Sequence, residues 1–265
     1  MKKQNGYHWE QSMKPILKLS KISYGYHTPS GEILSLKDVS FDVKKDEFLA
    51  IVGPSGCGKS TLLNILAGLL EPETGSIQFE NPDGSIKYPT VGYMLQKDEL
   101  LPWRTILENV VLGLEINHTL NKNSLESALQ MLQIYGLYAF KDAHPSELSG
   151  GMRQRAALIR TLLLNPQILL LDEPFSALDY QTRLNVSFDI SQILKKESKT
   201  AILVTHDLSE AISLADRIII LSKRPATVNK IMDIKLTKTT ASPEAARNAV
   251  EFPFYFNELW KELNQ

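Results

Sequence analysis

A glycine-rich segment between positions 53 and 61 has the residue types that bind a chain of phosphate groups. It reads Gly-Pro-Ser-Gly-Cys-Gly-Lys-Ser-Thr, which fits the phosphate-loop pattern of a glycine, four residues and Gly-Lys-Ser. Glycines let the backbone turn tightly, so that its N–H groups face an anion. Lys59 can reach the β- and γ-phosphates, and the Ser60 hydroxyl can coordinate Mg²⁺. We expect the whole segment to hold a nucleotide: Gly53, Pro54, Ser55, Gly56, Cys57, Gly58, Lys59, Ser60 and Thr61.

The flanks of this segment predict the elements that position it. The apolar run Phe48–Val52 suits a buried parallel strand. After the segment, apolar residues repeat at helical spacing, at Leu62, Leu63, Ile65, Leu66 and Leu69. A helix that begins near Lys59 directs the positive end of its dipole at the same anion. The alternative is a glycine turn before an ordinary helix, and the order of strand, loop and helix favours the phosphate site.

A second apolar run, at positions 168–171, ends in two acids, Asp172 and Glu173. A buried strand has no structural use for carboxylates at its tip, and burying them unpaired costs several kcal/mol. We therefore expect a cation or a water network there. Asp172 fits a Mg²⁺ ligand, and Glu173 fits a base that polarises the attacking water. The alternative is a pair of acids that caps the following helix.

Two further predicted strands end in polar residues, Gln96 after positions 91–95 and His206 after positions 201–205. Ligands of open α/β sheets lie beyond the carboxyl ends of the strands, so both side chains can reach the γ-phosphate side of a nucleotide. A neutral His206 imidazole can hydrogen-bond the γ-phosphate or the attacking water. Either residue alone says little, but together with Lys59 and Glu173 they converge on one edge of the sheet.

The sequence Leu-Ser-Gly-Gly at positions 148–151 predicts a second helix start that attracts anions. Ser149 is a good N-cap, Gly150 and Gly151 follow it, and apolar residues then repeat at helical spacing. One nucleotide needs one such site, so a second one suggests a ligand shared with another copy of the chain. A well-capped helix without a ligand is the alternative, and the residues leave both open.

Composition narrows the class of protein. The chain has 265 residues, which corresponds to one large domain or a core with an inserted lobe. The net charge of -1 gives no basic field for nucleic acid. A single cysteine fits a reducing cytoplasm, and no apolar run reaches the length of about 18 residues that would span a membrane. The polar start of the chain lacks the apolar middle of a signal peptide.

The order of the predicted elements indicates an α/β core with a helical lobe inserted in it. Arg217–Leu221 is expected to be the last strand, followed by a tail with a helix near positions 253–263. The predicted parts are a flexible tail (1–15), a β subdomain with the phosphate-loop half of the core (16–96), a helical subdomain (97–160), the second half of the core (161–222) and a C-terminal tail (223–265).

Three aromatic residues allow more than one interpretation. Tyr24 and Tyr26 precede a turn-rich segment, and either one stacks on adenine or both lie on a half-buried strand. Trp103 ends the apolar loop sequence Leu101-Pro102-Trp103. It is either an anchor for a partner protein or a core residue of the helical lobe.

Together these segments resemble the ATP-binding subunit of ABC transporters over about residues 16–225. The shared elements, in that family's order and spacing, are the phosphate loop, Gln96, Leu148-Ser149-Gly150-Gly151, the acidic strand end, Ser176-Ala177-Leu178-Asp179 and His206. The Leu-Ser-Gly-Gly sequence is the most specific to the family, because many other nucleotide hydrolases share the phosphate loop.

Four longer segments are similar to the nitrate/sulfonate/taurine branch of bacterial importers, which also includes relatives for thiamine precursors and riboflavin. They span positions 101–105, 150–155, 172–179 and 205–211. The chain departs from the family pattern at Asp46, Ile159 and Ala226, none of which touches the phosphate chemistry.

The resemblance implies a RecA-like phosphate-loop core, an antiparallel β subdomain and an inserted α-helical subdomain. It also implies a homodimer that encloses two ATP molecules. Each ATP would lie between the phosphate loop of one copy and Ser149, Gly150 and Gly151 of the other. By the same resemblance Tyr26 stacks on adenine, Glu173, His206 and Gln96 serve hydrolysis, and Ser60, Gln96 and Asp172 hold Mg²⁺.

The resemblance further implies partners in a membrane. Closure of the dimer would drive a separate integral membrane permease, which faces Gln96 and Leu101-Pro102-Trp103. A periplasmic or lipoprotein binding protein would deliver the substrate, and the chain would lie at the cytoplasmic face of the membrane. One alternative is a soluble ABC ATPase not attached to a transporter, for which no basic face, second cassette or coiled-coil insertion is visible. The other is a phosphate-loop kinase or GTPase-like switch.

Overall fold

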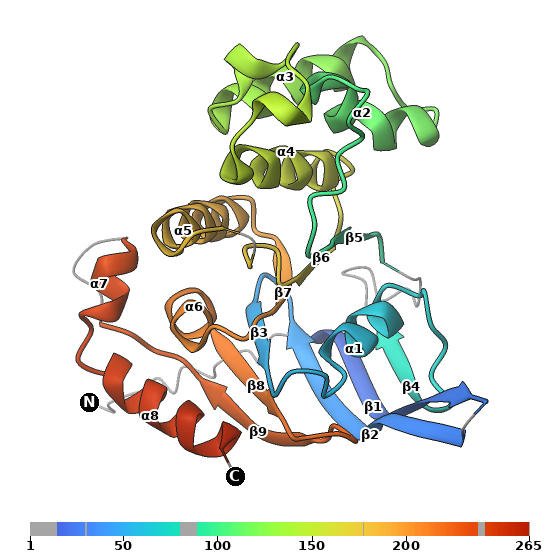
Figure 1. The fold of residues 1–265 in the computed structure, drawn as a ribbon, viewed down its shortest axis with the longest axis vertical. Helices are drawn as coiled ribbons and strands as arrows, with labels where there is room; N and C mark the ends of the chain where they lie inside the picture. Colours follow the sequence, from blue (N-terminus) through green and yellow to red (C-terminus); the bar gives the residue numbers. More distant parts are fainter. Residues whose placement is uncertain (1–14, 30, 80–88, 177, 238–241, 265) are drawn as a thin grey trace, which may run out of the picture.

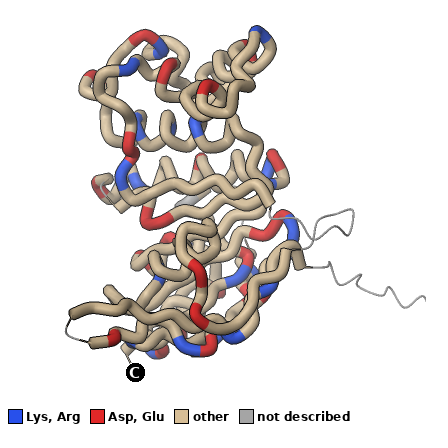
Figure 2. The backbone as a smooth tube through the Cα atoms, turned by 90° about the vertical axis from the view of Figure 1, so that its right-hand side faces the viewer, with Lys and Arg blue, Asp and Glu red and all other residues tan. Residues whose placement is uncertain are grey.

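A computed structural model describes residues 15–29, 31–79, 89–176, 178–237 and 242–264. The tail expected before position 15 lies outside these residues, and so does Ala177 of the Ser-Ala-Leu-Asp sequence. Figure 1 shows a core built on two sheets, with a group of helices standing apart from them. In Figure 2, turned by 90°, basic and acidic residues are interspersed along the same backbone.

The first sheet is antiparallel and has three strands in the order β2-β1-β4. They are β1 (Pro15–Thr28), β2 (Gly31–Lys44) and β4 (Thr74–Phe79). In β1, Leu17 and Leu19 are buried while Lys18 between them faces outward, because successive side chains of a strand point to opposite faces. The strand is irregular between Leu19 and Ile22, and Ile22 is again buried. The strand pattern predicted around the turn at 27–31 is therefore a long hairpin.

The second sheet carries the predicted parallel strands, in the order β5-β6-β7-β3-β8-β9. Its strands are β3 (Phe48–Val52), β5 (Val91–Met94), β6 (Ile168–Asp172), β7 (Thr200–Val204), β8 (Arg217–Leu221) and β9 (Val228–Asp233). Neighbours from β5 to β8 run parallel, and β9 runs antiparallel to β8. Four of these strands are buried along their whole length, which explains their continuous apolar sequence: β3, β6, β7 and β8.

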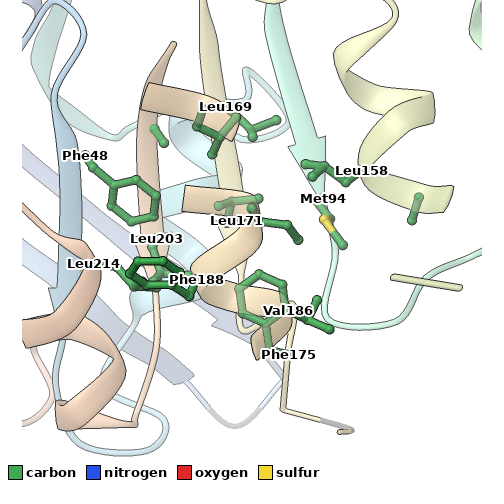
Figure 3. Close-up of a cluster of buried hydrophobic side chains, with 14 of the residues drawn as sticks. Phe48, Met94, Leu158, Leu169, Leu171, Phe175, Val186, Phe188, Leu203 and Leu214 are labelled. Atoms are coloured by element: carbon green, nitrogen blue, oxygen red, sulfur yellow. The ribbon is translucent and has the colours of Figure 1, made fainter. Parts of the chain in front are cut away.

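Alternate residues of the parallel strands fill two cores, one on each face of the sheet. On one face, Phe48, Leu171 and Leu203 pack with Phe188 and Leu214, as Figure 3 shows. The helices on that face include α5 (Tyr180–Lys196), α6 (Leu208–Leu214) and α8 (Phe252–Leu263). On the other face, residues such as Leu49 and Leu170 pack with the helix α1 (Lys59–Leu66) and with the antiparallel sheet. Burial of one such side chain contributes about 1.5–3 kcal/mol.

The helices that stand apart are α2 (Ile106–Ile116), α3 (Lys122–Ile134) and α4 (Gly150–Leu162). Thr105 caps α2, because its hydroxyl accepts from the Glu108 N–H while the Glu108 carboxylate accepts from the Thr105 N–H. Between α3 and α4 lie the short 3₁₀ turns η1 (Tyr138–Phe140) and η2 (Pro145–Glu147). Helix α4 lies between the other two helices, α2 and α3, and the core, and its residue Leu158 belongs to the buried apolar cluster.

The C-terminal part is more ordered than the predicted tail. The prediction that Arg217–Leu221 is the last strand was wrong, because β9 follows it and extends the sheet. The sequence of β9, Val-Asn-Lys-Ile-Met-Asp, hides this strand, since it neither alternates strictly between polar and apolar residues nor forms a continuous apolar run. Lys230 of β9 pairs with Glu258 and Glu262 of α8. A short helix, α7 (Pro243–Arg247), precedes α8.

The architecture confirms the predicted fold class, an α/β phosphate-loop core with an antiparallel β subdomain and an α-helical subdomain. Among the residues that the structure describes, no helix combines the length and the apolar character needed to cross a bilayer.

Candidate functional site: a phosphate loop and the polar groups around it

The phosphate loop joins β3 to α1, as its flanks predict. Lys59 is only 6% exposed, and its ammonium donates to the carbonyl oxygens of Gly53 (2.8 Å) and Pro54 (3.0 Å). Gly58 has a φ of 125°, and a Cβ there would come within 2.9 Å of Leu36 and Ser35. A residue with a side chain would therefore strain the loop and collide with β2. The loop owes its shape to glycine at this position and to the lysine bonds across it.

Ser60 and Asp172 meet at the carboxyl ends of β3 and β6. The Ser60 hydroxyl donates to Asp172 Oδ1 over 3.1 Å, and the hydroxyl of Tyr93 lies 3.4 Å from Oδ2. Burial raises the pKa of Asp172 above its ordinary value, against the opposing effect of these hydrogen bonds. A buried carboxylate beside a hydroxyl is a hard oxygen pair that a divalent cation would stabilise.

The donor set fits Mg²⁺ held mainly by its nucleotide. Among the described residues, no group of three or more His, Cys, Asp or Glu side chains gathers as a metal cage. Mg²⁺ typically takes one or two protein oxygens and completes its shell with phosphates and water. Ser60 and Asp172 supply such oxygens, and Gln96 lines the same cavity.

Glu173 and His206 form the second polar pair of the site. Glu173 Oε2 lies 2.9 Å from His206 Nδ1. The backbone of Glu173 adopts a φ of 45°, and its N–H donates to the Val204 carbonyl of β7 over 2.9 Å. A left-handed backbone at a residue with a long side chain is uncommon and is concentrated at functional sites. Glu173 directly follows β6, and its carboxylate lies beside His206, which follows the neighbouring strand β7.

A cavity of about 320 Å³ collects most of the predicted residues. Its lining residues are Ser55, Gly56, Gly58, Lys59, Ser60, Thr61, Gln96, Asp172, Glu173 and Arg224. Within it Gln96 donates to the Ser176 hydroxyl over 3.2 Å. Of the four groups predicted to converge on one edge of the sheet, Lys59, Gln96 and Glu173 line this cavity, and His206 does not line it but contacts Glu173.

Tyr26 lies at the other side of the phosphate loop. Its hydroxyl is 3.0 Å from Thr61 Oγ1, and 40% of the residue is exposed. Tyr24 packs instead against the core beneath the antiparallel sheet, and the two rings meet edge to face at 5.1 Å. The free ring surface belongs to Tyr26, which favours Tyr26 over Tyr24 as the platform for a base.

The Leu-Ser-Gly-Gly sequence lies outside this cavity, at the start of α4. Ser149 caps the helix by accepting from the Met152 N–H. A Cβ on Gly150 would come within 3.0 Å of Leu178, and one on Gly151 within 3.1 Å of Thr182. The two glycines therefore allow α4 to approach the segment after Ser176 closely. None of the three residues lines the cavity of its own chain.

Three residues near the site have no counterpart among the sequence predictions: Tyr93, Arg183 and Arg224. Arg183 donates to the carbonyls of Leu178 (3.0 Å) and Ser176 (3.4 Å), and it lies 3.7 Å from Asp207. It thereby joins the segment after Glu173 to the segment after His206. The sequence places Arg183 one turn into the helix that follows the acidic strand end. This position identifies it as a site residue only when the fold is known.

Glu210 lies beneath these segments as a buried acid. Desolvation raises its pKa to about 7, with the negative charges of Asp207 and Glu173 acting in the same direction and Arg183 against them. Cys57 is likewise buried within the phosphate loop, and burial raises the pKa of its thiol. Such a thiol is a packing residue rather than a nucleophile.

Comparison with known proteins assigns the class. The family described as ABC transporter matches residues 36–176. The ABC transporter ATP-binding protein YtlC of Bacillus subtilis, described as uncharacterized, is 46% identical over 249 residues, covering 94% of this chain and 96% of YtlC. The aliphatic sulfonates import ATP-binding protein SsuB of Bacillus cereus is 35% identical, with 91% of this chain and 96% of SsuB covered.

A solved structure of similar fold is also described as an ATP-binding cassette. The dimeric post-hydrolysis state of the ATP-binding cassette MJ0796, bound to ADP and Pi, superimposes with a TM-score of 0.70 at 31% identity. The match covers 83% of this chain and 99% of that cassette. The chain belongs to the ABC transporter family. It is an ATP-binding cassette that hydrolyses ATP.

Proposed function

We propose that this ATPase energises the import of a small molecule through a separate membrane permease, in a system of the nitrate/sulfonate/taurine type. Two observations support the import branch. SsuB, which matches this chain over nearly its whole length, is described as an import protein for aliphatic sulfonates. Four sequence segments are similar to that branch, and one of them, at positions 172–179, supplies Asp172 and Glu173 to the cavity.

The single observation that carries the proposed mechanism is the separation of two anion-binding segments. Ser60, Asp172 and Glu173 line one cavity, whereas Ser149 and its glycines do not. We infer that a second copy of the chain brings its Ser149, Gly150 and Gly151 to the nucleotide. The dimeric state described for MJ0796 supports this arrangement.

The chain's own residues then divide the work of hydrolysis. The phosphate-loop N–H groups and Lys59 bind the β- and γ-phosphates. Glu173 accepts a proton from the attacking water, and the hydrogen bond from His206 holds the carboxylate in position. Gln96 faces the γ-phosphate side, where its amide donates to the Ser176 hydroxyl. Bound at Ser60 and Asp172, Mg²⁺ would neutralise charge on the phosphates.

The permease contact is proposed at Gln96 and the Leu101-Pro102-Trp103 loop. Trp103 is 71% exposed, so its interpretation as a core residue of the helical lobe was wrong. A large exposed aromatic side chain is a typical anchor of an interface. The proposal places the chain at the cytoplasmic face of the membrane and gives substrate delivery to a separate binding protein. We also retain the predicted parts at 16–96, 97–160 and 161–222, with β9 of the C-terminal part (223–265) added to the core sheet.

The import function is tested with the chain isolated from detergent-solubilised membranes of its source cells. We expect an integral membrane protein to co-purify and, after reconstitution into vesicles, to move solute toward the side that holds ATP and this chain. Trp103→Ala should weaken this association, while Trp260→Ala, which removes another exposed tryptophan on α8, should not. A chain that hydrolyses ATP but never associates with a membrane protein would favour the soluble ABC ATPase. Movement of solute away from the ATP side would identify an exporter.

A further inference from the structure

Arg224 holds the phosphate loop from outside the motif. Its Nε and one terminal nitrogen both donate to the carbonyl oxygen of Gly56, over 3.0 and 2.5 Å. Arg224 also lines the same cavity as Lys59 and Glu173. The residue is 168 positions away from Gly56 in the chain. It arrives there because β8 and β3 are neighbours whose carboxyl ends share one edge of the sheet.

The loop that carries Arg224 is fixed on both sides. The Ser222 hydroxyl accepts from the Thr227 N–H over 2.9 Å, which closes the loop. Ala226 is fully buried, its N–H donates to the Ser35 carbonyl, and its carbonyl accepts from the Lys37 N–H, each over 2.9 Å. Arg224 is therefore presented by an anchored loop, although its own side chain is exposed.

The bond to Gly56 decides which way one peptide unit faces. Gly56 has a φ of 72°, which only glycine adopts easily, so the peptide that follows it is a point where the loop could rotate. The C=O and N–H of a trans peptide point in opposite directions. With its oxygen on Arg224, the Gly56 carbonyl is directed to the arginine, and the Cys57 N–H donates to Pro54 within the loop over 3.2 Å.

The end of the phosphate loop at Thr61 is held by Ser35, a residue of β2. The Ser35 hydroxyl donates to Thr61 Oγ1 over 3.3 Å, while the Ser35 carbonyl accepts from Ala226. One residue of β2 thus anchors both the end of the phosphate loop and the segment that carries Arg224. The loop is thus secured at Gly56 and at Thr61 by hydrogen bonds within the chain.

We propose that Arg224 is a positioning residue for the phosphates: it keeps the Gly56 carbonyl off the anion site, so that the loop is preformed for ATP and ADP. A carbonyl oxygen that faced the phosphates would repel them, whereas N–H groups attract them. Arginine suits the task because its planar fork offers several donors to one oxygen. The inference rests on nucleotide binding at this loop.

The test compares nucleotide affinities of purified variants with those of the wild type. Arg224→Ala should weaken both ATP and ADP about tenfold, the loss of one charge-assisted contact. Adenosine, which has no phosphate, should bind the variant and the wild type equally. Arg224→Lys keeps the charge and one donor and should weaken both nucleotides only about threefold. Lys122→Ala, which removes an exposed charge on α3 far from the cavity, serves as the control.

Three results would overturn the role of Arg224. Equal affinities of wild type and Arg224→Ala would show that the contact does not matter. A loss confined to ATP, with ADP unchanged, would indicate a direct contact with the γ-phosphate instead. Loss of adenosine binding together with a lowered Tm, in Arg224→Lys as well as in Arg224→Ala, would indicate a general structural role. A wild-type protein that binds no nucleotide would refute the proposed site itself.

Discussion

Glu173 Oε2 and His206 Nδ1 lie 2.9 Å apart, at the ends of the neighbouring strands β6 and β7. The two residues are 33 positions apart in the sequence. Register between the strands pairs Asp172 with Val204, so the residues that follow each strand emerge side by side. A carboxylate that is oriented by a neighbouring imidazole can accept a proton from water in a fixed direction.

Glu173→Gln should nearly abolish ATP turnover and leave ATP binding intact. The amide keeps the shape of the side chain but cannot accept the proton, and a general base typically contributes roughly 10²–10⁴-fold. ATP that is bound but not hydrolysed should also hold the dimer together. Phosphate release, nucleotide binding and sedimentation measure the three effects. Glu126→Gln, an exposed change on α3, is the control, and wild-type turnover in Glu173→Gln would rule out the base.

His206→Ala should lower kcat about tenfold, because Glu173 loses the hydrogen bond that orients it. The affinity for ATP should change little, since the phosphate loop is untouched. Steady-state kinetics with a separate binding assay distinguish these effects. His118→Asn provides a matched control: His118 is exposed, and asparagine tolerates its positive φ of 54°. A loss of affinity at unchanged kcat would contradict the positioning role.

Lys59→Ala should weaken the binding of both ATP and ADP and raise each Kd at least about a hundredfold. The substitution deletes the buried ammonium that would meet the phosphates and that bridges the Gly53 and Pro54 carbonyls. Equilibrium binding with Lys122→Ala as the control measures the loss, and circular dichroism checks the fold. Unchanged affinity would remove Lys59 from the site.

Glu210 should make stability depend on pH. Its pKa is about 7 in the folded chain, against 4.5 in the unfolded chain. As pH rises, the unfolded chain therefore loses this proton at a lower pH than the folded chain does. The free energy of unfolding should therefore fall as pH rises from 4.5 to 7 and then level off. Glu210→Gln should remove this dependence and gain on the order of 3 kcal/mol above pH 7, at about 1.36 kcal/mol per pKa unit.

Urea unfolding at pH 5 and pH 8 measures this effect, and Glu126→Gln, exposed on α3, is the control for loss of one carboxylate. If wild type and Glu210→Gln show the same pH dependence, the buried acid is charged throughout. Asp207, Arg183 and Glu173 surround Glu210, so activity should be followed in the same samples.

Local sequence patterns predicted the fold class and the strands that carry the site. The apolar runs at β3, β6 and β7 have few alternatives, because strands buried on both faces leave continuous apolar sequence. Glu173 and His206 follow such strands directly, which explains why their proximity could be expected. Their hydrogen bond depends on strand order, and a pattern of residues does not contain that order.

Other features depend on contacts between distant segments. The strand β9 lies at the edge of the sheet and buries few apolar side chains, so its sequence resembles a loop. The ion pairs of Lys230 with Glu258 and Glu262 of α8 help to hold this strand in place. Arg224 belongs to an unremarkable polar segment, and only the pairing of β8 with β3 brings it to Gly56. For Trp103, residue spacing could not distinguish a core residue from an exposed one, whereas the exposure of its side chain in the structure does.

The central claim is that each ATP is hydrolysed between two copies of the chain, and mixing two inactive variants tests it most directly. Lys59→Ala spoils the phosphate loop, and Ser149→Arg spoils the opposite segment. A dimer with one copy of each retains one site with both halves intact. We predict that each variant alone hydrolyses almost no ATP and that a one-to-one mixture regains a substantial part of wild-type turnover. A mixture no more active than the two variants measured apart, or full activity of Ser149→Arg alone, would contradict the account.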